Sequence, residues 1–332
     1  METIEILQNI WFLLLGILFI GYSILDGFDL GVGILFPFLA KDESEKQNLF
    51  NIIWPFWDGN EVWLLTAGGA LFAAFPYAYA TVFSGFYLAL MLVLFALIFR
   101  AVSIEFWHHD EKRRWLWAKA FTFGSFIPAL LYGVALGNVI LGIPLDAKMN
   151  FTGSFFTLLR PYPLAIGLLG LAAILFQGVM FILLKTEGEL QQRAKSFIRK
   201  IWLIHSITLL LSLIMTFLYM PESLHNGWAW ISFAIVLICA FLSLRASEAS
   251  RDLKAFLLSS ASFIGLWGIA GVIQYPNLVT ASLGNHITIF NGSSTQLTLT
   301  VMLIIAGVGM PIVICYTAYV YRVFKGKIKN LY

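Results

Sequence analysis

Long apolar runs dominate the chain, and short charged or Pro-, Gly- and Asn-rich segments separate them. A helix needs about 20 mostly apolar residues to cross a hydrocarbon layer of about 30 Å, so each run of this length is a candidate membrane span. The runs cover residues 10–36, 52–75, 79–105, 117–142, 161–184, 200–220, 227–245, 255–275 and 298–322. The pattern predicts an all-α polytopic membrane protein with about nine transmembrane helices.

Composition supports the membrane class. Of the 332 residues, 60% are hydrophobic and 12% are charged, whereas soluble domains carry about 25% charged residues. A soluble globular protein is therefore excluded. The formal net charge of +3 is too small and too dispersed to indicate a nucleic-acid partner.

The lysines and arginines indicate how the chain is oriented, because cytoplasmic loops are enriched in them. If the nine runs alternate in direction, all of the 21 cations except Lys148 and Arg160 fall on one side. The N-terminus is therefore expected outside and the C-terminus in the cytoplasm. The last run is followed by a basic tail of Arg322, Lys325, Lys327 and Lys329.

The polar connections suggest how the chain is organised. Residues 1–145 are predicted to form a four-helix bundle, 146–160 an external connection, and 161–280 a second four-helix bundle. Residues 281–332 would hold an external loop and the ninth helix with its basic tail. The loop around 275–296 is too polar and too interrupted by Pro, Gly and Asn to span a membrane, so we expect it to fold as a structured outer cap.

Ionisable side chains inside the runs are the candidate chemistry, since each costs at least about 2.5 kcal/mol at the centre of a membrane helix. Asp26 and Asp29 in the first run, and Asp58 and Glu61 in the second, are each three residues apart and so share a helix face. From a rise of about 1.5 Å per residue, Asp29, Asp58 and Arg100 are expected at similar depths below the cytoplasmic surface. Arg100 is their natural counter-ion.

One guanidinium cannot neutralise four carboxylates, so some of these acids are expected to hold protons at neutral pH. Recessed carboxyls open to the cytoplasm are what a proton path requires. Asp58 is the leading candidate, whereas Asp26 is expected to pack or cap a helix. The alternative is that the acids simply hold helices together, above all Glu61, which could accept hydrogen bonds from Trp side chains.

Histidines argue against a haem held by this chain alone. A haem between helices with two axial ligands needs two inward ligands at one depth, and only His205 lies within a run. A His205–Met215 pair remains open, but a lone membrane histidine is more often a hydrogen-bonded core residue. No Cys or His cluster indicates another metal site.

With these residues in place, the sequence resembles subunit II of cytochrome bd-type quinol oxidases along its whole length. The resemblance rests on LDGFDLGVG at 25–33, WDGNEVWL at 57–64, Arg100 followed by Glu105-Phe106, and residues 311–319 ahead of FKGK at 324–327. The second string is the most specific. In that family, subunit II has two four-helix bundles plus one peripheral helix.

The resemblance implies a function. The complex would oxidise quinol at the outer face of the bacterial cytoplasmic membrane and reduce O2 to water with protons from the cytoplasm. Haem b and haem d would lie on subunit I, the main partner, and small single-span accessory subunits and a bound quinone occur in some members. Asp58 matches the family's proton-path acid, Asp29 and Arg100 match positions of less defined role, and Trp63 falls where an O2 route has been proposed.

Two other functions agree less well with the positions of the acids and histidines. A proton-coupled secondary transporter would place its binding groups at the midplane between repeats, whereas these acids occupy one half of the chain and lie nearer the inner surface. A stand-alone b-type cytochrome would need more histidines inside the membrane.

Overall fold

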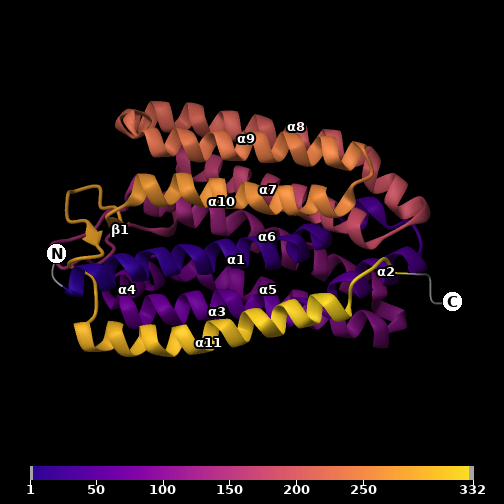
Figure 1. The fold of residues 1–332 in the computed structure, drawn as a ribbon, viewed down its shortest axis with the longest axis horizontal. Coiled ribbons are helices and arrows are strands. Elements are labelled where there is room, and N and C mark those ends of the chain that lie inside the picture. Colours follow the sequence, from indigo (N-terminus) through magenta and orange to yellow (C-terminus); the bar gives the residue numbers. More distant parts are fainter. Residues whose placement is uncertain (1–2, 329–332) are drawn as a thin grey trace.

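The computed structural model describes residues 3–328 and is almost entirely helical (Figure 1). Among these residues, eight helices are long and apolar enough to cross a membrane. They are α1 (Thr3–Leu39), α5 (Tyr87–His109), α6 (Arg114–Leu141), α7 (Pro161–Lys185), α8 (Gly188–Tyr219), α9 (Gly227–Glu248), α10 (Asp252–Gln274) and α11 (Gln296–Val323). The prediction of an all-α polytopic membrane protein is confirmed. Lys329 of the predicted basic tail lies outside the described residues.

Three shorter helices lie before and within the second and third predicted runs, and α5 forms most of the third run. They are α2 (Glu43–Ile53), α3 (Trp57–Ala74) and α4 (Pro76–Gly85). The predicted run 52–75 starts before α3 does, because residues 52 and 53 complete α2 and a turn precedes α3. The run 79–105 is divided at Phe86, between α4 and α5. Pro76 begins α4 because a proline at the first helical position needs no backbone N–H donor.

Close helix contacts at glycines hold the centre of the bundle together. Helix α1 packs against α3, α6, α7 and α10. Where α1 crosses α7, a Cβ atom on Gly31 would lie 2.7 Å from the Cα of Gly178. Where α6 crosses α7, a Cβ on Gly133 would lie 2.8 Å from the Cα of Gly167. Small residues allow such close approach, so the first half of the chain is packed directly on the second.

A polar cap covers the end of the bundle at which α1 begins (Figure 1). It contains the antiparallel strands β1 (Asn277–Val279) and β2 (Ile287–Thr288). Bridges Ile143–Ala281 and Leu145–Phe151 tie in the connection before α7. This connection includes the 3-10 turn η2 (Phe155–Leu158), and two further turns, η1 (Glu111–Arg113) and η3 (Pro221–His225), link other helices. The structured cap expected from the sequence is therefore present.

Helix α11 lies along the edge of the molecule (Figure 1), and among its described residues only Leu299 is buried. Its beginning is fixed by Trp11, whose indole Nε1 donates to the Leu299 carbonyl at 3.0 Å. Its end is fixed by Lys185, whose Nζ donates to the Phe324 carbonyl at 2.5 Å. Helix α11 is thus attached mainly at its two ends.

Candidate functional site: a buried charge cluster

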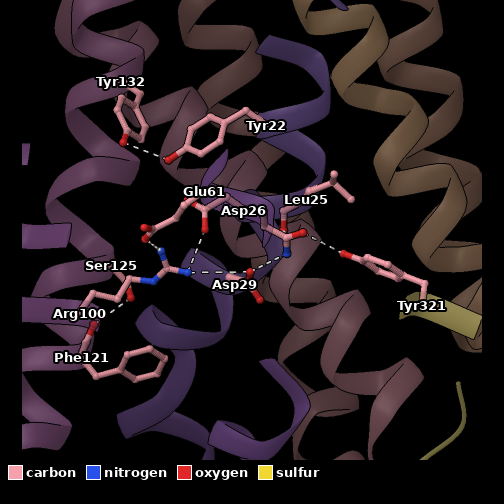
Figure 2. Close-up of polar contacts among 11 residues, drawn as sticks. Tyr22, Leu25, Asp26, Asp29, Glu61, Arg100, Phe121, Ser125, Tyr132 and Tyr321 are labelled. Carbon is pink, nitrogen blue, oxygen red and sulfur yellow. Dashed lines mark hydrogen bonds and ion pairs between the residues drawn. The ribbon is translucent and has the colours of Figure 1, made fainter. Parts of the chain in front are cut away.

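Helix α1 provides the acidic side of a buried cluster. Asp26 and Asp29 are three residues apart on a regular helix, so both side chains project from one face. Both are fully buried. They face α3 and α5, which pack against this part of the bundle (Figure 2).

Arg100 of α5 is the cation at the centre of the cluster, and its side chain is fully buried. Its Nη2 donates to Asp26 Oδ1 at 2.9 Å, and its Nη1 donates to Glu61 Oε1 at 2.7 Å. The same Nη2 lies 3.9 Å from Asp29 Oδ2. One guanidinium therefore contacts three carboxyls that come from two helices (Figure 2).

Asn60 of α3 links Asp29 to α11. Its Nδ2 donates to Asp29 Oδ2 at 2.7 Å and to the Leu25 carbonyl at 3.2 Å. Its Oδ1 accepts a hydrogen bond from the Tyr321 hydroxyl at 3.3 Å. Asn60 is almost fully buried, so these contacts satisfy an amide that has little access to water.

Two tyrosines lie beside the cluster on the side facing the polar cap. The hydroxyl groups of Tyr22 on α1 and Tyr132 on α6 are 3.0 Å apart. Their rings meet edge to face with centroids 5.5 Å apart. Tyr22 is one helical turn before Asp26, so the tyrosine pair lies next to the carboxyls, toward the beginning of α1 (Figure 2).

The cluster contains more acid than base. Asp26, Asp29 and Glu61 share the single guanidinium of Arg100. Asp26 Oδ2 and Asp29 Oδ1 are buried and have no hydrogen-bond partner among the described residues. An uncompensated charge in a low-dielectric interior is costly, so an electrically neutral cluster requires two protons on its three carboxyls. Asp29 Oδ1, which no donor in residues 3–328 contacts, is one place where such a proton would fit.

Asp58 does not join this cluster, contrary to the depth expected from the sequence. It is exposed and, within the described residues, makes no hydrogen bond or ion pair. The reason is that α3 begins at Trp57, so Asp58 lies in the first turn of its helix rather than two turns inside one. It is one turn before Glu61, whose side chain is 24% exposed and bonded to Arg100.

The structure shows the partners of two further acids. Asp26, expected to pack or cap a helix, is the fully buried partner of Arg100 and so links α1 to α5. Glu61 accepts its short hydrogen bond from Arg100 and not from a Trp side chain. Trp63 is half-buried, and its Nε1 has no partner in the described part of the chain. Its ring packs directly against Gly21 of α1.

His205 does not form a haem site with Met215. Both lie on α8, ten residues apart, which is about 15 Å along a helix, too far to ligate one iron. His205 is 1% exposed, and neither ring nitrogen has a hydrogen-bond partner within residues 3–328, contrary to the expectation of a hydrogen-bonded core residue. The described residues also contain no group of three His, Cys, Asp or Glu side chains that could hold a metal ion.

Sequence reasoning missed four polar members of the site: Asn60, Tyr22, Tyr132 and Tyr321. Asn60 gave a usable signal, because an amide between two acids near the start of an apolar run needs a partner. Tyr22 could have been found from its four-residue spacing to Asp26. Tyr321 resembles an ordinary span-end aromatic and Tyr132 an ordinary aromatic within an apolar run, and only the tertiary structure shows their contacts.

Comparisons with known proteins agree across the whole chain. The family model described as cytochrome bd terminal oxidase subunit II matches residues 7–324. The chain is 34% identical over 362 aligned positions to cytochrome bd-I ubiquinol oxidase subunit 2 of Escherichia coli K12, covering 98% of this chain and 96% of that protein. It is also 34% identical over 330 positions to cytochrome bd ubiquinol oxidase subunit 2 of Bacillus subtilis, covering 98% and 97%.

A solved structure has the same fold. A chain of the bd oxidase from Geobacillus thermodenitrificans superimposes with a TM-score of 0.81 at 17% sequence identity. The match covers 96% of this chain and 98% of that chain. The arrangement of helices is therefore shared although few residues are.

Proposed function

Because the chain belongs to the family of cytochrome bd terminal oxidase subunit II, we propose that its buried charge cluster carries protons used in oxygen reduction. The family resemblance seen in the sequence is confirmed. The chain is a subunit of a quinol oxidase, an oxidoreductase complex of the respiratory chain, and it forms that complex with subunit I. Haems belong to the complex in this family.

The haems are proposed to lie on subunit I. A haem between two axial ligands needs a second ligand at the depth of His205, and Met215 does not supply it. His205 and Met215 therefore do not form a two-ligand haem site. The contribution proposed for this chain is structural support and proton transfer.

The proposed proton route begins at Asp58 and continues through Glu61 to Asp26 and Asp29. Asp58 is exposed at the start of α3, and Glu61 follows one turn later with its side chain 24% exposed. Glu61 and Asp26 bond to the same guanidinium. The acids thus lead from the surface to the interior, and the excess of carboxyls over guanidinium supports proton occupancy. This surface-to-interior sequence of acids is the observation on which the proposal rests.

The proposed arrangement in the membrane follows from the same elements. Helix α3 is 18 residues long, and we count it as a ninth crossing beside the eight apolar helices. The end with the basic tail would face the bacterial cytoplasm, and the polar cap would face outward. Residues 1–145 and 161–280 would form two four-helix bundles, with α11 as the peripheral helix. The O2 route at Trp63 stays a prediction.

The test is the variant Asp58→Asn in the purified oxidase complex reconstituted into vesicles. Oxygen consumption and charge uptake are expected to fall at least about tenfold, since a positioned proton-transfer group contributes at least this much. The haem spectrum should remain that of the wild type. Glu189→Gln is the matched control, because Glu189 is an exposed acid in the first turn of α8, near Arg193, which pairs with Glu45 of α2. Wild-type turnover in Asp58→Asn would remove Asp58 from the route.

The transporter alternative is not favoured. A secondary transporter would bind its substrate between repeats at the midplane. The clustered acids here come from α1 and α3 alone and share one guanidinium, and the family is that of an oxidase subunit.

A further inference from the structure

The end of α11 reaches the charge cluster through a single side chain. The hydroxyl of Tyr321, three residues before Phe324, donates to Asn60 Oδ1 at 3.3 Å. The Tyr321 ring packs on Phe56, with centroids 4.4 Å apart, and edge to face on Phe28 at 6.4 Å. A tyrosine from the most exposed helix is therefore inserted into the aromatic core beside Asp29 (Figure 2).

The contacts of Asn60 fix the direction in which its amide points. Its Nδ2 faces the Leu25 carbonyl and Asp29 Oδ2, which are both acceptors in this arrangement. Its Oδ1 faces the Tyr321 hydroxyl, which donates. If the amide turned over, its oxygen would face two acceptors, the Leu25 carbonyl and Asp29 Oδ2, and the Tyr321 hydroxyl would have to change from donor to acceptor. The hydroxyl of Tyr321 therefore helps to keep an N–H donor directed at Asp29.

Lys185 holds this end of α11 in place. It is 7% exposed, and its Nζ donates to the carbonyl of Phe324 at 2.5 Å, a group that the helix end leaves without an intrahelical partner. The carbonyl of Lys185 accepts from the Ile328 N–H at 2.9 Å. Its Nζ also lies over the rings of Phe56 and Phe181, 5.2 and 5.9 Å from their centroids. A buried cation thus fixes both the last turn of α11 and the residues after it.

We propose that Tyr321, held by Lys185, is a positioning residue for proton transfer at Asp29. By fixing the Asn60 amide, Tyr321 keeps Asp29 Oδ2 as a hydrogen-bond acceptor and leaves Oδ1 as the oxygen that takes and releases the proton. The inference rests on the proposed function and adds to it a residue that positions Asp29 for proton transfer. Because only Leu299 of the described α11 residues is buried, Tyr321 is held by its own ring contacts and by the attachment at Lys185.

The experiment compares variants of the whole oxidase complex by the pH dependence of turnover. Tyr321→Phe keeps the ring and removes the hydroxyl. Without the hydroxyl, Asn60 Oδ1 loses its donor, and only the Leu25 carbonyl still opposes a turned amide whose oxygen accepts from a protonated Asp29. We expect the alkaline limb of the turnover profile to move to higher pH by about half a unit or more, with unchanged haem content. Tyr319→Phe is the matched control, because Tyr319 is an exposed tyrosine two residues away.

Lys185→Met is expected to move the alkaline limb of the turnover profile in the same direction. Lys185→Arg is expected to keep the wild-type profile, because it keeps a cation beside the Phe324 carbonyl. Tyr321→Phe by itself decides the outcome if Lys185→Met does not assemble. A profile of Tyr321→Phe that superimposes on the wild type overturns the positioning role. Asp29→Asn separates the two proposals. If it slows turnover while Tyr321→Phe does not, only the positioning role fails. If Asp29→Asn turns over like the wild type, the proposed route through Asp29 fails.

Discussion

Replacement of Arg100 by Leu is expected to destabilise the subunit strongly. The side chain is fully buried and donates to Glu61 at 2.7 Å and to Asp26 at 2.9 Å. A hydrogen bond to a charged group is worth about 1.5–3 kcal/mol, and removing one partner of a buried ion pair costs about 3–5 kcal/mol. The two contacts therefore place the expected loss of unfolding free energy at about 3–5 kcal/mol.

The assay is thermal unfolding of the purified complex, with haem retention as a second measurement. Arg100→Leu should unfold at a clearly lower temperature and lose haem earlier. Arg245→Leu is the control, because Arg245 is 66% exposed and its ion pair with Glu248 spans 3.5 Å. Such surface pairs contribute about 0–1 kcal/mol, so this variant should unfold like the wild type.

A triple variant tests the physical cause. Adding Asp26→Asn and Glu61→Gln to Arg100→Leu removes the carboxylates that lost their cation, so part of the stability should return. The reasoning is refuted if Arg100→Leu unfolds at the wild-type temperature. It is also refuted if the triple variant is no more stable than Arg100→Leu, since the loss would then come from packing and not from unpaired charge.

Three further outcomes are expected. His205→Leu should raise the unfolding temperature without changing the haem spectrum, because it removes a buried ring whose nitrogens have no partner in the described residues; a lost haem signal would contradict this. Gly31→Ala should lower the free energy of unfolding by about 1–3 kcal/mol, because its added methyl group would push α1 away from Gly178. Gly307 has open space around it, so Gly307→Ala should be neutral or stabilising in the same unfolding assay. The backbone N–H of Asn150 lowers the pKa of Asp146. The turn at 146–150 should therefore be equally ordered at any pH above the usual carboxyl range, and its order should decrease as the pH falls through the lowered pKa. Amide hydrogen exchange in this turn should become faster at that pH in the wild type and not in Asp146→Asn.

The positions of the long helices could be predicted because uninterrupted apolar runs have few alternatives in a membrane protein. The division at Phe86 could not, since no charged residue or proline marks it. The start of α3 was misplaced because Pro55 interrupts an apolar run without adding charge. Because the predicted span begins about one turn before α3 does, the sequence places Asp58 too deep, at the level of the cluster.

The acids of the cluster could be found from sequence, but their partners could not. Asp26, Asp29, Glu61 and Arg100 were identifiable because charge is rare in apolar runs. Which carboxyl meets the guanidinium depends on the rotation of α1 against α3 and α5, and spacing along a single helix does not determine that rotation. Tyr321 was beyond prediction because its contact joins the end of the chain to a residue 261 positions earlier.

The distance along the chain between Asp26 and Arg100 sets an order on membrane insertion. Arg100 is synthesised 74 residues after Asp26, which takes about 4–15 s at about 5–20 residues per second. During that interval α1 carries two acids whose cation is not yet made, and Gly178, against which it packs, is later still. Helix α1 is therefore made before α5 supplies the cation for its acids and before α7 supplies its packing partner.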